Sequence, residues 1–286
     1  MSELFKYAVH GSRLVPLELP ELGRDVHELM QDMPAGIYSA LRSYHGYRFV
    51  KLDAHLARSE RCIERAGWSV RFDRDDLCQA IDIAARAYAG DFRLRFDLLE
   101  HPISRAGEQT QVFMALAPHA PVPDRIVREG AHLGLAPDGL RRREPLIKFT
   151  RWVAERRVCE REASAYEYLL LDDDGRILEG VSSNFFGISG RALLTTASDA
   201  LEGVTARLVI ELARARGLSV AYERVSVAQL GRLDEAFITS STREIVPVTR
   251  IAGTPIGTGQ VGPIVAELRA DYTSYAETHS MPAWVR

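Results

Sequence analysis

Hydrophobic side chains in the first part of the chain follow two different periods. Ile37–Tyr44 and Tyr47–Leu52 are apolar, aromatic-rich runs on either side of His45-Gly46, and this pattern predicts a β-hairpin. After Asp53, a candidate N-cap, apolar positions recur at helical spacing until Gly67, which predicts a helix. The pattern also predicts a helix at Asp75–Tyr88 and strands at Phe92–Leu99 and Gln111–Ala117. We therefore expect an α+β unit here.

Three prolines follow this unit within six residues. Pro118, Pro121 and Pro123 lie too close together for a helix or a central strand, so we expect a linker at residues 118–123. The linker would separate a small N-terminal domain, residues 1–117, from a larger one, residues 124–286. In the larger domain the pattern predicts strands at Tyr166–Leu171, Arg176–Leu178, Phe185–Ile188, Ala192–Thr195 and Ala236–Thr239, and helices from Gly203 to Gly217 and at Pro263–Glu277.

Composition narrows the classes of protein. The 286 residues include 36 basic and 39 acidic side chains spread along the chain, so no basic stripe points to nucleic acid. No apolar run approaches a membrane span and the start of the chain is not a leader, so we expect a soluble, cytoplasmic protein that does not bind a membrane. The three cysteines are scattered, which argues against a disulfide framework and a metal site.

The basic residues are almost all arginines. Only Lys6, Lys51 and Lys148 are lysines among the 36. Lysine, unlike arginine, can form a Schiff base and release its proton near neutral pH. Lys148 lies in an apolar run, Pro145 to Phe149, that would suit such chemistry. Composition alone equally allows Lys148 to be a remnant in an arginine-rich chain.

Three further segments carry polar groups in suggestive places. Glu179–Phe186 puts a carboxylate at the end of one predicted strand and small polar residues before the next. Gly203-Val204-Thr205 opens a predicted helix, where backbone N–H groups favour a phosphate. Ser240-Ser241-Thr242 follows a predicted strand and offers three hydroxyls. Taken singly, each is as well explained as an ordinary turn or a helix start bound to water.

Order and spacing connect these segments. From about Tyr38 to Leu268 the chain resembles the fold type IV pyridoxal-phosphate enzymes, a class IV group that includes branched-chain aminotransferases, D-amino-acid aminotransferases and aminodeoxychorismate lyases. The family pattern has His-Leu-x-Arg, a lysine, a Glu-Gly-x-x-Ser-Asn-x-Phe-like segment about 31 to 34 residues later, a Gly-Ile/Val-Thr helix start, and a hydroxyl-rich segment ending in Glu-Ile-x-Pro-Val. The matching segments begin here at His55, Lys148, Glu179, Gly203 and Ser240.

The resemblance implies roles for individual residues. It makes Lys148 the Schiff-base and proton-transferring lysine of pyridoxal 5′-phosphate, with Glu179 as the partner of the pyridine nitrogen. The residues expected at the phosphate or against the ring are Arg58, Leu201, Val204, Thr205, Ser240 and Ser241. The family fold implies a small N-terminal α/β sandwich and a larger C-terminal β-barrel-like domain with helices, in a homodimer.

Substrate residues follow from the same resemblance. Arg93 and Arg95 share one face of a predicted strand, and Arg95 matches the arginine of a Tyr-x-Arg strand that faces the active site in branched-chain enzymes. Tyr38 and Thr242 are also expected at the substrate. From the residues alone, both arginines could equally be solvent-facing strand residues.

The chain departs from the family at three places. Residues 34–39 lack the usual Asp-x-Gly pattern, Trp152 and Val153 occupy the region of a tyrosine common in aminotransferases, and Ala206 replaces an arginine. We expect transfer of an amino group from an amino acid, with hydrophobic or branched-chain L-amino acids favoured, to a 2-oxo acid. The alternatives are a D-amino-acid or (R)-amine transaminase, an aminodeoxychorismate lyase, and a catalytically silent cofactor-binding protein.

Overall fold

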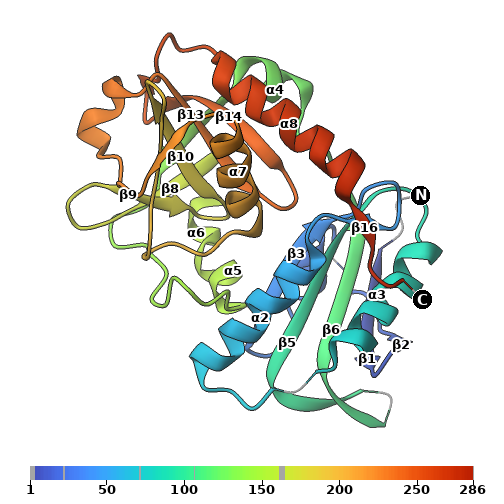
Figure 1. Cartoon of the computed structure of the whole chain (residues 1–286). Coiled ribbons are helices and arrows are strands. Elements are labelled where there is room, and N and C mark those ends of the chain that lie inside the picture. Colours follow the sequence, from blue (N-terminus) through green and yellow to red (C-terminus); the bar gives the residue numbers. More distant parts are fainter. Residues whose placement is uncertain (1–3, 22, 71, 106, 161–164, 286) are drawn as a thin grey trace. The chain divides into compact units, whose positions relative to one another are not determined.

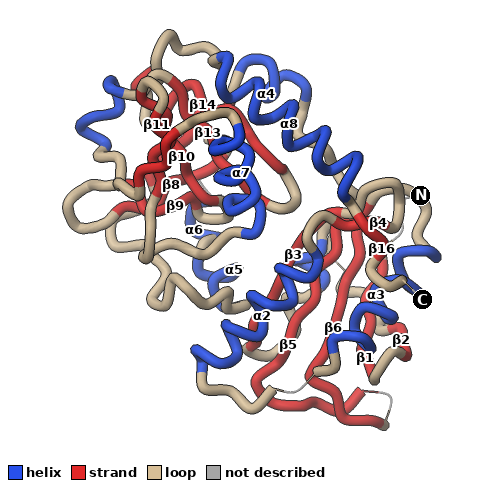
Figure 2. Tube along the Cα trace, in the orientation of Figure 1, coloured by secondary structure: helices blue, strands red, loops and turns tan. Residues whose placement is uncertain are grey.

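The computed structural model describes residues 4–21, 23–70, 72–105, 107–160 and 165–285. The chain divides into two compact units (Figure 1). The first comprises residues 1–120, 147–154 and 275–286, and the second comprises residues 121–146 and 155–274. Both contain helices and strands (Figure 2). Among the described residues no helix is both long and apolar enough to cross a membrane.

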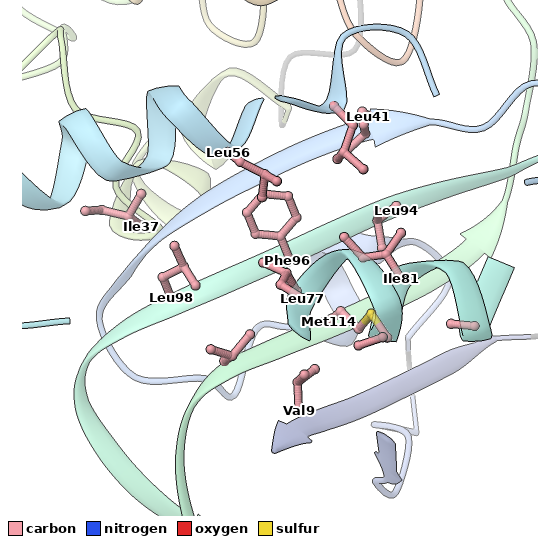
Figure 3. Packing of buried hydrophobic residues seen from close by; sticks show 14 of the residues in the cluster. Val9, Ile37, Leu41, Leu56, Leu77, Ile81, Leu94, Phe96, Leu98 and Met114 are labelled. Atoms are coloured by element: carbon pink, nitrogen blue, oxygen red, sulfur yellow. The ribbon is translucent and has the colours of Figure 1, made fainter. Parts of the chain in front are cut away.

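The first unit is built on an antiparallel sheet of five strands in the order β2-β1-β6-β5-β3. These strands are β1 (Phe5–His10), β2 (Arg13–Pro16), β3 (Gly36–Arg42), β5 (Phe92–Arg105) and β6 (Glu108–Pro118). Helices α2 (Leu52–Ala66) and α3 (Arg74–Ala87) pack on one face, where Phe96 of β5 lies among Leu56 and Leu77 (Figure 3).

Side chains alternate strictly across this sheet. Met114 of β6 belongs to the core under α2 and α3, whereas Phe113 and Ala115 join a second core with α1 (Val26–Leu29) on the opposite face. The same period of two puts Leu94, Phe96 and Leu98 of β5 in the first core. Arg95 and Asp97 therefore point to the face that carries α1.

The predicted hairpin in the first unit is wrong in its pairing. Strand β3 pairs with β5, and only Tyr44 and Arg48 exchange backbone hydrogen bonds, at 2.7 and 2.9 Å. Strand β4 (Arg48–Phe49) instead pairs with β16 (Met281–Pro282), more than 230 residues later, a partner that local periodicity cannot reveal. The helix expected after Asp53 is confirmed as α2, which ends at Gly67 (φ +68°), although its N-cap is Lys51.

The second unit contains a mixed nine-stranded sheet in the order β12-β11-β10-β13-β14-β7-β8-β9, with β15 paired to β14. Helix α7 lies against this curled sheet (Figure 2). The strands are β7 (Ala131–Leu135), β8 (Glu167–Leu171), β9 (Ile177–Gly180), β10 (Asn184–Ser189), β11 (Ala192–Thr195), β12 (Ser219–Ala221), β13 (Glu235–Ser240), β14 (Glu244–Ile251) and β15 (Thr254–Pro255). The helices are α4 (Asp124–Glu129), α6 (Arg157–Glu160), α7 (Val204–Ala215) and the 3₁₀ turn η1 (Val227–Arg232).

The chain passes from one unit to the other within two of its helices. Helix α5 (Arg151–Glu155) begins in the first unit and ends in the second, and α8 (Pro263–His279) begins in the second and ends in the first. The expected strands of the second part are found as β8, β9, β10, β11 and β13, and the two expected helices as α7 and α8. A linker at residues 118–123 stays a prediction, as do the domain limits 1–117 and 124–286.

Candidate active site

Lys148 lies on a short segment that runs along the free edge of β3 in the first unit. The Tyr38 amide donates to the Lys148 carbonyl at 3.0 Å, and Ile37 forms a β-bridge with Phe149. Ile147 and Phe149 are buried on either side, while the lysine itself is half-buried. Its Nζ lies 4.6 Å from the centre of the Tyr38 ring. The apolar run thus anchors the backbone and leaves the amine against an aromatic face.

Arg58 belongs to a buried polar cluster in the same unit. Its Nη2 donates to the Ser39 hydroxyl at 2.8 Å, and that hydroxyl lies 2.8 Å from Nδ1 of His55. Burial lowers the pKa of His55 well below its usual value, and the charges of Arg58 and Lys148 lower it further. A neutral His55 can accept the Ser39 hydrogen, so this ring orients Ser39 and, through it, the guanidinium of Arg58.

The other two lysines also have specific settings in the first unit. Lys6 is 3% exposed and forms a salt bridge with Asp32. Lys51 has a left-handed backbone at the start of α2, and its Nζ lies 5.7 Å from the Tyr275 ring. Each of the three lysines therefore has a specific side-chain contact: Lys6 with Asp32, Lys51 with Tyr275 and Lys148 with Tyr38.

Glu179 lies near the end of β9 in the second unit and is 2% exposed. Arg142, itself 7% exposed, donates from Nε to Oε1 of Glu179 at 2.7 Å. The Leu201 amide donates to Oε2 at 3.2 Å. A buried carboxylate is retained in a dry interior when a cation and hydrogen bonds compensate it, and both are present here.

The start of α7 lies in the second unit without a capping side chain on Gly203. Thr205 Oγ1 and Ser241 Oγ are 2.9 Å apart, so the helix start and the turn after β13 are in contact. Asn184 holds the approach to this helix by donating to the Leu201 carbonyl at 2.8 Å. A Cβ on Gly203 would lie 2.0 Å from the Asn184 Oδ1, so this position requires glycine.

An ion pair between buried Glu167 and half-buried Arg243 braces two loops of the second unit. Arg243 forms a salt bridge with Glu167 and donates to Ser182 Oγ at 2.8 Å and to Ser240 Oγ at 3.2 Å. The Ser182 amide also donates to Glu167 at 2.7 Å. Burial alone would raise the pKa of Glu167, but the Arg243 charge and the Ser182 hydrogen bonds outweigh it and hold that pKa below its usual value. The loop after Glu179 is thereby fixed to the turn that contains Ser240, Ser241 and Thr242.

The two arginines of β5 have different surroundings. Arg95 is 2% exposed, and its guanidinium carbon lies 4.6 Å from the Tyr38 ring centre. Arg93 is half-buried, stands opposite Arg42 in the ladder, and its charge acts on His119. The solvent-facing alternative is therefore wrong for Arg95, which the structure brings to Tyr38.

Comparison with known proteins identifies the family. Residues 36–251 match the family model for amino-transferase class IV, which covers most of the chain. The chain belongs to the class IV aminotransferase family.

Relatives of this class IV aminotransferase carry different activities in their names. D-alanine aminotransferase from Bacillus licheniformis is 28% identical over 88% of this chain and 92% of its own length. Aminodeoxychorismate lyase from Bacillus subtilis is 26% identical over 76% and 77%. Branched-chain-amino-acid aminotransferase from Pseudomonas aeruginosa is 31% identical over 38% and 36%.

Solved structures establish the fold type of this class IV aminotransferase. The branched-chain amino acid aminotransferase of Thermobaculum terrenum in its PLP-form superimposes with a TM-score of 0.74 at 22% identity, over 99% of this chain and 98% of that one. The expected α+β, fold type IV architecture is confirmed.

The sequence reasoning gave no role to several polar residues of this class IV aminotransferase. They are Ser39, His55, Asp97, Arg142, Glu167, Asn184 and Arg243. A role for His55 could have been inferred, because it begins the His-Leu-x-Arg segment that pointed to Arg58. No sequence pattern distinguishes Arg142 from its neighbours Arg141 and Arg143, which are both exposed in the structure.

Proposed function

We propose that this class IV aminotransferase uses Lys148 to move an amino group from an amino acid with a hydrophobic side chain to a 2-oxo acid. The observation that carries the proposal is the setting of Lys148, whose amine faces Tyr38 at 4.6 Å and whose charge reaches the buried His55 beside Arg58. Family membership supports this chemistry, because class IV aminotransferases depend on pyridoxal 5′-phosphate.

The side chains present fit that cofactor. The uncapped start of α7 offers the amides of Val204 and Thr205 to a phosphate, and the Thr205 and Ser241 hydroxyls lie together beside it. From the family resemblance we also assign Arg58 and Ser240 to the binding of the cofactor phosphate, and Leu201 to the ring. Glu179 is buried and pairs with Arg142, which favours the carboxylate, the form that can accept a hydrogen bond from a protonated ring nitrogen.

When bound, the cofactor draws electrons away from the substrate Cα. The protein side chains move the protons and hold the reacting groups in position. We assign to the Lys148 amine the removal of the Cα proton and its return on the other side of the nitrogen. Ile147 and Phe149 keep the segment in place and exclude water from one side of it. Glu179 holds the proton at the ring nitrogen, and Arg142 keeps Glu179 negatively charged.

Hydrophobic L-amino acids, branched-chain ones first, are the proposed donors, with Tyr38, Arg95 and Thr242 at the substrate. The aromatic face of Tyr38 and the local match to a branched-chain enzyme support this choice. A D-amino acid is the second candidate, because the D-alanine aminotransferase match extends over 88% of the chain. We further propose that the protein is cytoplasmic and that, as the family resemblance implies, it forms a homodimer.

Replacement of Lys148 tests the proposal directly. Lys148→Ala should lower kcat by at least about a hundredfold, since a positioned acid–base group contributes that much or more. In the wild-type protein, borohydride reduction followed by peptide mapping should find a pyridoxyl group on Lys148. Lys51→Asn is the matched control, because asparagine tolerates the left-handed backbone there.

The donor is identified by mixing the cofactor-loaded enzyme with L-amino acids, D-amino acids and amines one at a time, without an acceptor. Conversion to pyridoxamine phosphate, followed by absorbance, should be fastest with leucine, isoleucine or valine of L configuration. Faster conversion with D-alanine would select the second candidate. Pyruvate release from aminodeoxychorismate without an acceptor would select the lyase, and a labelled residue other than Lys148 would refute the assignment of the lysine.

A further inference from the structure

Arg95 and Asp97 form a buried, bidentate ion pair in the first unit. Nε and Nη2 of Arg95 donate to the two oxygens of Asp97, both at 2.7 Å. The side chains are 2% and 0% exposed. The third nitrogen of the guanidinium, Nη1, lies 3.1 Å from Nδ1 of His27. Each of the three guanidinium nitrogens therefore has a protein partner.

The charges around this pair balance. Lys6 acts on Asp97 as a second nearby cation, and Lys6 has its own salt bridge with Asp32. Two cations thus face two carboxylates. Burial raises the pKa of Asp97, while the charges of Arg95 and Lys6 oppose that rise. Arg95 therefore sustains the ionisation of Asp97, and Asp97 cancels the charge of Arg95.

Tyr38 links this pair to the reactive amine. The centre of its ring lies 4.6 Å from Nζ of Lys148 and 4.6 Å from the guanidinium carbon of Arg95. The amine and the guanidinium are consequently no more than about 9 Å apart, which is within the reach of an amino acid whose Cα lies beside that amine. His27 packs edge-on against the same ring at 5.7 Å.

We propose that Asp97 determines specificity by neutralising Arg95, so that the enzyme takes substrates with uncharged side chains and rejects dicarboxylic ones. This inference rests on the proposed function. A second carboxylate brought beside Arg95 would leave water for a guanidinium whose charge Asp97 already compensates, which is costly. An uncharged side chain meets no such penalty. Arg95 then contributes to the substrate site by holding Tyr38 and His27 in place and not by binding a carboxylate.

The wild-type enzyme gives the first test. With a donor found in the half-reaction screen, kcat/KM for 4-methyl-2-oxopentanoate should exceed that for 2-oxoglutarate by at least about a hundredfold, or about 2.7 kcal/mol. Binding provides a readout without turnover: by calorimetry, 4-methylpentanoate should bind at least about tenfold more tightly than glutarate. Equal preference in either experiment overturns the inference.

Asp97→Asn gives the second test, because the amide keeps the shape of the side chain and removes its charge. The variant should shift the kcat/KM ratio and the binding ratio at least about tenfold toward the dicarboxylic compounds. The double variant Arg95→Gln/Asp97→Asn should lose this shift. Asp91→Asn is the matched control, since Asp91 pairs with Arg42 in the same unit and should leave both ratios unchanged.

The outcomes separate this inference from the proposed function. If Asp97→Asn retains the wild-type melting temperature and cofactor absorbance but not the shift, the specificity role is wrong. If Asp97→Asn does not fold, the wild-type ratios decide. An enzyme that converts dicarboxylic and uncharged donors equally well refutes only the role of Asp97, whereas one that converts no amine refutes the proposed function.

Discussion

Glu179 and Arg142 form the most enclosed ion pair of the second unit for which we propose a role. Their side chains are 3% and 4% exposed, and the Nε–Oε1 distance is 2.7 Å. Removing one member of such a pair costs much more than the pair contributes net, because the other charge remains buried without compensation. Arg142 should therefore control how well Glu179 serves the cofactor.

Arg142→Met tests this role. Methionine keeps much of the volume and removes the charge, so Glu179 should lose its ionised form or its position. We expect kcat to fall at least about tenfold, equivalent to about 1.4 kcal/mol, with weaker binding of pyridoxal 5′-phosphate. Steady-state kinetics and cofactor titration measure the two effects. Arg141→Met is the control, because Arg141 is exposed and pairs with exposed Asp173. Equal behaviour of the two variants would exclude a special role for Arg142.

At this scale the sequence indicates residues with chemical character better than their partners. The order and spacing of short segments pointed to Lys148, Glu179 and Arg58. The partners Arg142 and Ser39 come from distant positions, 37 and 19 residues away, and nothing in their own surroundings in the sequence marks them. Such pairs are selected by tertiary packing, which short motifs do not encode.

The start of helix α7 is the element whose exact placement matters most for the proposed phosphate site. Gly203 allows Asn184 to come close enough to hold the Leu201 carbonyl, which places the segment before the helix. Leu201 also donates its amide to Glu179, so one short segment is tied both to Asn184 and to the proposed ring partner. A displacement of this segment should be felt at both places.

Gly203→Ala should produce that displacement. Its Cβ would overlap the Asn184 side chain, and we expect a loss of about 1–3 kcal/mol in the free energy of unfolding, together with weaker cofactor binding. Urea denaturation and cofactor titration measure these changes. Gly231→Ala is the control, because no atom lies within 4 Å of a Cβ built there. Unchanged cofactor affinity in Gly203→Ala would argue against a phosphate site at this helix start.

Elements with strong local patterns were predicted and elements without them were missed. Helix α7 shows regular apolar spacing and a closing Gly217 (φ +75°), so it was found. Strand β14 was missed although it lies inside the nine-stranded sheet, because Pro247 within it argues against a central strand. There Pro247 stands opposite Phe237 of β13. Tertiary pairing overrides the local preference.

At the scale of the whole chain, the α+β class was predictable but the grouping of segments was not. Residues 147–154 and 275–286 belong to the first unit, far from its main part in sequence. The backbone bonds of Gly36 and Tyr38 to Thr150 and Lys148 join the first of these segments, and the β4–β16 pair joins the second. Hydrophobic periodicity reports local structure, so it cannot show such returns of the chain.

Two histidines of the first unit should make the stability of the protein sensitive to acid. His55 is completely buried beside Arg58 and has a pKa well below its usual value. Burial lowers the pKa of His119 from 6.5 to about 4, with further lowering by the charges of Arg42 and Arg93. An unfolded chain binds protons at these histidines below about pH 6.5, whereas the folded chain binds them only at a lower pH. Stability should therefore be complete above about pH 7 and should decline as the pH falls toward about 4.

His119→Leu should flatten this decline. Neither ring nitrogen of His119 is exposed, and neither has a hydrogen-bond partner within the described part of the chain, so leucine removes an uncompensated polar group. We expect the variant to match or exceed the wild type at pH 8, by up to about 1 kcal/mol, and to lose less stability between pH 7 and pH 5. Urea midpoints measured across this range test the expectation. His101→Gln, at an exposed position, should follow the wild-type curve. A His119→Leu curve as steep as the wild type would assign the acid sensitivity to other groups, with His55 the first to examine.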